Sequence, residues 1–69
     1  MDTIEIVING KTYPVKPESS ITDILDMLKL NRNTAIVEYN RNILSKDDFT
    51  ATIVNGGDSL EIVRFVGGG

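Results

Sequence analysis

Few side chains in this sequence could carry out chemistry. Its 69 residues include no cysteine, no histidine and no tryptophan. The missing cysteine excludes a disulfide framework, a thiolate nucleophile and a persulfide held on a side chain. Because cysteine and histidine are both missing, the usual zinc ligands and the Cys–His and Ser–His dyads are excluded as well.

The other polar candidates each have a structural explanation. Asp23 and Asp26 are expected on a solvated helix face, and Asp47-Asp48 is expected to cap a turn. Neither pair supplies the number of oxygens that an ordered calcium site needs. Gly56-Gly57 predicts a turn, because no helix follows it to bind a phosphate. The serines lie at expected caps and turns without a base to activate them: Ser19, Ser20, Ser45 and Ser59. We therefore do not expect an autonomous enzyme.

The chain ends in three glycines, Gly67, Gly68 and Gly69, directly after an apolar segment. Glycine has no Cβ, so such a backbone can enter a narrow cleft. At roughly 3.3–3.6 Å per residue, residues 66–69 reach about 13 Å, which is enough to thread into a partner's active site. In this interpretation the terminal carboxylate is the reactive group. In the alternative interpretation the glycines are a frayed end or a remnant of cloning.

The composition, 41% hydrophobic and 25% charged, fits one small globular domain. Ten acidic and seven scattered basic residues give a net charge of −3, which argues against a nucleic-acid partner. No apolar run approaches the roughly 20 residues that span a bilayer. The start, Met1-Asp2-Thr3, lacks the basic region of a signal peptide, so we expect a cytoplasmic protein.

The first half of the sequence predicts a β-hairpin and a helix. Isoleucines alternate through residues 2–8 as in a half-buried strand, and Asn9-Gly10 predicts a tight turn into a return strand, Lys11–Val15. Pro14 has no N–H to donate, so this strand is expected at an edge. A helix of about ten residues is expected after Ser19 or Ser20. Its apolar stripe is Ile21, Ile24, Leu25 and Leu28.

The second half predicts further strands. We expect strands at residues 34–39, 43–44 and 60–66, with Phe49 pointing inward from a capped turn. The first and last strands should be parallel neighbours joined by a crossover through the helix. This order predicts an α+β, β-grasp (ubiquitin-like) fold, in which a mixed sheet of four to five strands wraps one main helix. Residues 1–66 would form a single domain, and residues 67–69 a flexible glycine tail.

The C-terminal run GDSLEIVRFVGGG (57–69) resembles the ending of the ThiS family of thiamine-biosynthesis sulfur carriers. The hairpin INGK (8–11), the helix ITDILDML (21–28) and the segment AIVEYNRNIL (35–44) resemble that family too, so the resemblance covers essentially the whole chain. Glu38 and Tyr39 depart from it modestly, where small apolar residues would also fit. The molybdopterin-synthase small subunit and ubiquitin also end in Gly-Gly, but the FVGGG ending and the small size favour ThiS.

The resemblance implies a protein substrate, with no cofactor of its own. A ThiF-like adenylyltransferase would use Mg-ATP to adenylate the Gly69 carboxylate. A sulfur donor, such as a cysteine desulfurase persulfide, would then form a thiocarboxylate. A ThiG-like thiazole synthase would take the sulfur from Gly69. Gly67 and Gly68 would form the narrow segment of backbone that enters the partner's active site. We expect the free protein to be a monomer.

Partners must also recognise the body of the protein. Leu60 and Ile62 are expected to face the core, while the surface offered to partners comprises Val63, Arg64, Phe65 and Val66. Alternatively, Phe65 folds back onto the core and Arg64 simply lies in solvent. Three other functions stay open: a molybdopterin-type carrier, a ubiquitin-like modifier, and a β-grasp interaction domain with an irrelevant tail.

Overall fold

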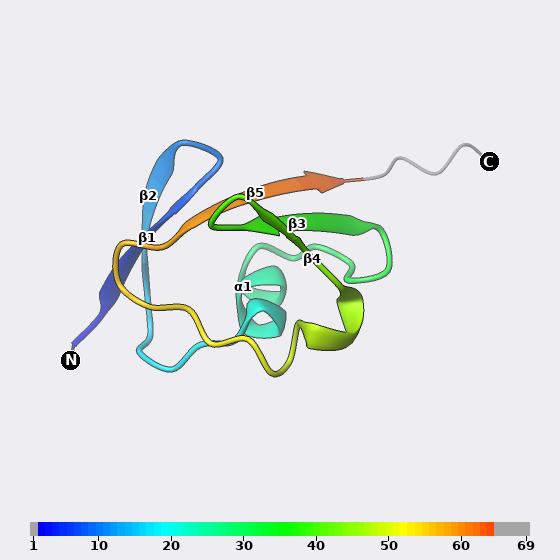
Figure 1. Ribbon diagram of the computed structural model, residues 1–69. Coiled ribbons are helices and arrows are strands. Elements are labelled where there is room, and N and C mark those ends of the chain that lie inside the picture. The colour runs from blue at the N-terminus through cyan, green and yellow to red at the C-terminus, as the bar shows by residue number, and fades with distance from the viewer. Residues whose placement is uncertain (1, 65–69) are drawn as a thin grey trace.

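The computed structural model describes residues 2–64 of the chain. These residues form a five-stranded mixed sheet in the order β2-β1-β5-β3-β4, and one α-helix packs on one face of it (Figure 1). The elements are β1 (Ile4–Ile8), β2 (Lys11–Val15), α1 (Ile21–Met27), β3 (Ala35–Tyr39), β4 (Asn42–Leu44), a 3-10 helix (Lys46–Asp48) and β5 (Ser59–Arg64). The predicted order of elements and the predicted mixed sheet are confirmed.

The β1–β2 hairpin turns at Asn9-Gly10, as predicted. Both residues have a positive φ, 51° and 83°, which is the backbone of a two-residue turn that follows the strand twist. β2 lies at the edge of the sheet, as Pro14 led us to expect. Pro14 is opposite Glu5, whose carbonyl accepts a hydrogen bond from Gly57 on the other side of β1. The nitrogen of Pro14 therefore points away from β1, where no ladder hydrogen bond is lost.

The helix begins as predicted but is shorter than predicted. Ser20 is the N-cap: its hydroxyl accepts from the Asp23 N–H, and the Asp23 carboxylate accepts from the Ser20 N–H. The predicted length of about ten residues is wrong, because α1 has seven. Lys29 takes a left-handed φ of 60°, and the N–H of Leu30 bonds the carbonyl of Leu25, which ends the helix in a Schellman motif.

β5 is the central strand, with β1 on one side and β3 on the other (Figure 1). It is parallel to β1 and antiparallel to β3, as the crossover through α1 requires. The strand begins at Ser59, one residue before the predicted start, and is described as far as Arg64. Phe65 and Val66, the predicted last residues of this strand, lie outside the described part of the chain.

The core lies between the sheet and α1. The predicted helix stripe contributes Ile21, Ile24 and Leu25, and Phe49 reaches in from the turn after β4, as predicted. The other buried apolar side chains come from the strands and from the segment before β5: Ile6, Ile8, Val15, Ala35, Val37, Val54, Leu60 and Ile62. This packing fixes which face of β5 is buried and which is exposed.

Candidate functional site

The alternation predicted for β5 is confirmed over its described residues. Leu60 and Ile62 are buried, whereas Val63 is 59% exposed and Arg64 is exposed. The remaining predicted site residues lie outside residues 2–64: Phe65, Val66, Gly67, Gly68 and Gly69. The role of Val63 and Arg64 in partner binding remains a prediction.

The outer face of the sheet carries more apolar surface than Val63 alone. Ile36 on β3 is the cross-strand neighbour of Val63 and is half-buried. On β4, Ile43 is 75% exposed and is paired with Glu38 of β3. Ile36 and Ile43 were not predicted as surface residues, although the alternation of Ala35–Tyr39 places Ile36 on the outer face. Together, Val63, Ile36 and Ile43 make up an apolar patch on this face.

Glutamates interrupt this apolar patch. Glu61 of β5 is directly opposite Glu38 of β3, and Glu5 of β1 is exposed on the same outer face. Glutamate is depleted in strands, and like charges placed opposite each other destabilise a sheet. The outer face is therefore both apolar and acidic, which suits a partner surface with basic groups around an apolar centre.

A hydrogen-bonded cluster fixes the start of β5. The Tyr39 hydroxyl donates to Asp58 at 2.6 Å, and the Asn55 N–H donates to the same carboxylate at 2.7 Å. Asn40 donates to Asp58 at 3.2 Å and accepts from the Ser59 N–H at 2.9 Å. The cluster joins the β3–β4 turn to the turn before β5.

The same contacts shift two pKa values. Burial raises the pKa of Asp58, but the hydrogen bonds from Tyr39, Asn55 and Asn40 together outweigh it and leave this pKa below its ordinary 3.8. The hydrogen bond to Asp58 raises the pKa of Tyr39 above its ordinary 10.0, and burial and the carboxylate charge add to this. Asp58 is therefore ionised and held in place near neutral pH, with no proton to exchange there.

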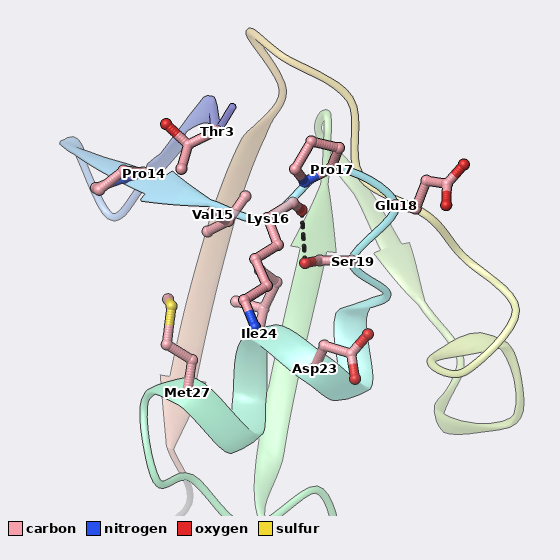
Figure 2. Close-up of a pocket in the computed structure, with 10 residues that line it drawn as sticks. All are labelled: Thr3, Pro14, Val15, Lys16, Pro17, Glu18, Ser19, Asp23, Ile24 and Met27. Carbon is pink, nitrogen blue, oxygen red and sulfur yellow. Dashed lines mark hydrogen bonds between the residues drawn. The ribbon is translucent and has the colours of Figure 1, made fainter. Parts of the chain in front are cut away.

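A groove of about 600 Å³ lies between β2 and α1 (Figure 2). Its apolar lining comprises Pro14, Val15, Pro17, Ile24 and the partly exposed Met27. Two of its polar side chains serve local structure: Ser19 donates to the Lys16 carbonyl at 2.7 Å, and Asp23 belongs to the helix cap.

The described residues contain little else that could act on a substrate. Within residues 2–64, no cluster of three or more aspartates or glutamates could hold a metal ion. In that same stretch, every buried side-chain nitrogen or oxygen has a hydrogen-bond partner. No helix in the described part of the chain is long and apolar enough to cross a membrane.

A five-stranded mixed sheet in this order around one helix defines a ubiquitin-like β-grasp domain. The family profile described as the ThiS family matches residues 6–69, so the match includes the three terminal glycines. This chain belongs to the ThiS family. The sequence left a molybdopterin-type carrier and a ubiquitin-like modifier open as alternatives. The match favours the ThiS family, whose ending the C-terminal run 57–69 resembles.

Solved and curated relatives agree with this assignment. The crystal structure of a thiamine biosynthesis protein (ThiS) from Geobacter metallireducens superposes with a TM-score of 0.81 at 33% identity, covering 96% of this chain and 100% of that one. The sulfur carrier protein ThiS of Bacillus subtilis is 36% identical over 63 residues, which are 90% of this chain and 96% of that protein. The predicted β-grasp fold is thereby confirmed.

A third relative is much longer. A thiazole synthase from Paramagnetospirillum magneticum is 35% identical over 66 residues, which cover 96% of this chain. The chain spans only 20% of the length of that protein. The similarity is therefore to one segment of the longer polypeptide.

Proposed function

We propose that this chain is a sulfur carrier for thiazole formation in thiamine biosynthesis and that it is a protein substrate, not an enzyme. The observation that carries the proposal is the ThiS family match, which extends through Gly69. The likeness to the Bacillus sulfur carrier over nearly its whole length supports it. The reactive group in this proposal is the terminal carboxylate of Gly69, because the chain has no cysteine on which to hold sulfur.

Activation of the carboxylate is the first step of the proposed reaction. A carboxylate is a poor electrophile, so a ThiF-like adenylyltransferase would use Mg-ATP to activate it. A carboxylate oxygen of Gly69 attacks the α-phosphorus of ATP, pyrophosphate leaves, and an acyl adenylate forms. Gly67 and Gly68 let the backbone enter the partner's site, since neither carries a Cβ.

Sulfur enters in the second step. The terminal sulfur of a persulfide, such as that of a cysteine desulfurase, attacks the acyl carbon, and AMP leaves with the former carboxylate oxygen. The product is an acyl disulfide, which keeps the S–S bond of the persulfide. A further thiol then reduces that S–S bond, is itself oxidised to a disulfide, and releases the thiocarboxylate. We propose that a thiazole synthase is the acceptor, which the similarity to a segment of the Paramagnetospirillum thiazole synthase supports.

The body of the protein would serve as the recognition element. We propose that partners bind the outer sheet face at Val63, Ile36 and Ile43, with Arg64 and the following Phe65 and Val66 leading to the tail. This face adjoins the C-terminal end of β5, so a partner that covers it lies close to where the tail begins. ATP-dependent activation also suits the cytoplasmic location expected from the sequence.

Intact-mass spectrometry tests this function. The chain is incubated with a ThiF-like enzyme, Mg-ATP, a cysteine desulfurase with cysteine, and a thiol reductant. The expected result is a mass increase equal to the difference between sulfur and oxygen. A variant lacking Gly68 and Gly69 should keep the circular dichroism spectrum and unfolding curve of the full chain and should show no conversion.

Two other results would count against the proposed sulfur-carrier function. An unchanged mass, with an enzyme that converts its own carrier in the same assay, contradicts the sulfur-carrier function. Isopeptide linkage to lysines or stable binding to a molybdopterin-synthase large subunit would instead indicate a modifier or a molybdopterin-type carrier.

A further inference from the structure

Asn9, in the turn between β1 and β2, forms two hydrogen bonds with a residue that lies 53 positions later. Its Nδ2 donates to the Ile62 carbonyl at 3.1 Å, and its Oδ1 accepts from the Ile62 N–H at 2.8 Å. Its own N–H donates to the Leu60 carbonyl at 2.9 Å. The Asn9 side chain thus continues the pairing that β1 makes with β5 after the backbone of β1 has turned away.

The turn itself does not require this side chain. Asn9 has a φ of 51°, which asparagine tolerates and glycine adopts without strain. A glycine in its place would therefore preserve the turn and remove only the two bonds to Ile62. The amide has a role that the local conformation of the hairpin does not explain.

Beyond Leu60, the backbone of β5 no longer pairs with β1. The backbone register pairs β1 with only Ser59 and Leu60 of β5, whereas Val63 and Arg64 pair with β3 alone. Within residues 2–64, the Asn9 amide is the last hydrogen-bonding partner of β5 on its β1 side. The segment that carries the reactive terminus begins directly after Arg64.

We propose that Asn9 is a positioning residue of the carrier reaction, because its two hydrogen bonds to Ile62 order the end of β5 before an activating enzyme binds. This inference rests on the proposed function. A strand end that is already ordered in the free protein loses less conformational freedom on binding, so the complex is more stable. The same contacts persist through the chemical step, so the effect belongs to KM and not to kcat.

Asn40 provides a matched control in the second hairpin. It also opens a two-residue turn, with a φ of 48°, and its Oδ1 accepts from the Ser59 N–H at 2.9 Å. Its contact is at the start of β5, the opposite end from the tail. Asn40→Gly therefore removes two side-chain hydrogen bonds, to Ser59 and Asp58, and leaves Asn9 and Ile62 in place.

The test compares the full chain with Asn9→Gly and Asn40→Gly at a temperature where all three are fully folded. Steady-state formation of the acyl adenylate by a ThiF-like enzyme gives kcat and KM for the carrier, and amide hydrogen exchange by NMR follows the Ile62 N–H. For Asn9→Gly we expect faster exchange at Ile62 and a KM raised about three- to tenfold, which is the order of the backbone entropy of one residue that must be fixed on binding. Its kcat should change less than about twofold, because the chemical step is untouched.

Asn40→Gly should lose protection at Ser59 but keep the Ile62 exchange rate and the KM of the unsubstituted chain. An unchanged KM for Asn9→Gly, or an equal rise in both variants, overturns the inference while the proposed function stands. Failure of the unsubstituted chain to react with a demonstrably active enzyme instead overturns the proposed function. If Asn9→Gly does not fold, Asn9→Asp replaces it. That variant keeps the acceptor for the Ile62 N–H and loses the donor, so an unchanged KM there also overturns the inference.

Discussion

The Tyr39 hydroxyl donates a 2.6 Å hydrogen bond to Asp58 and so joins the end of β3 to the start of β5. Removing the hydroxyl with Tyr39→Phe should lower the free energy of unfolding by about 1 kcal/mol. The charged acceptor strengthens this bond, but its partial exposure to solvent weakens it. Urea unfolding at neutral pH measures the difference. Tyr13→Phe is a suitable control, since no side-chain hydrogen bond of Tyr13 was found within residues 2–64.

The same pair sets a dependence of stability on pH. Because folding lowers the pKa of Asp58, its contribution is present above the ordinary value of 3.8 and is lost as the pH falls through the folded pKa. Because folding raises the pKa of Tyr39, its contribution is present below 10.0 and is lost as the pH rises through the folded pKa. The stability difference between the unsubstituted chain and Tyr39→Phe should therefore be largest between these limits. A difference that stays constant at both extremes would contradict this assignment.

Leu25→Ala tests the assignment of the core face of α1. Leu25 is 1% exposed, so its truncation should cost roughly 2–5 kcal/mol, a large share of the stability of so small a domain. Met27 on the same helix is 44% exposed, and Met27→Ala should cost about 1 kcal/mol or less. Equal losses for the two variants, measured by urea unfolding, would show that the core face is misassigned.

Lys29→Gly should stabilise the protein. Lys29 occupies the left-handed position after the helix, which glycine adopts without the cost that a Cβ brings. We expect a gain of about 0.5–1 kcal/mol, visible as a melting temperature higher by several degrees. Lys29→Ala keeps the Cβ and should give no gain, so a similar rise for both substitutions would rule out the backbone explanation.

Val63→Gln tests the proposed recognition face. The exposed half of Val63 should contribute about 1 kcal/mol when a partner covers it, so KM in the adenylation assay should rise roughly fivefold. The thermal unfolding midpoint should change little, because the side chain is already largely in solvent. Met27→Gln changes an exposed side chain on α1, away from the sheet face, and should leave KM unaltered.

The sequence predicted most of the fold because its local signals agree with one another. Alternation identified β1 and the buried side of β5, Asn9-Gly10 identified the turn, and the Ser19-Ser20 pair identified the start of α1 to within one residue. The end of α1 was misplaced because Leu28 and Leu30 continue an apolar pattern after the helix has ended. A lysine at the left-handed position gave no signal comparable to that of a glycine.

The connections around β5 could not be predicted in the same way. Asn9 and Asn40 were recognisable as turn residues, but their hydrogen bonds reach residues 53 and 19 positions away. Such contacts depend on the strand order and register of the finished sheet. The pairing of Glu38 with Glu61 likewise follows from the register of β3 against β5, for which neither strand alone carries a signal.

Pro14 has a consequence for the behaviour of the protein at high concentration. An exposed edge strand is a template on which a second chain can add a strand, and repeated addition leads to fibrils. At Pro14 the outward position has no hydrogen to donate, so this template is interrupted near the C-terminal end of β2. We infer that strand addition at the β2 edge of the sheet is hindered, because the ring nitrogen of Pro14 faces that edge and cannot donate a hydrogen bond.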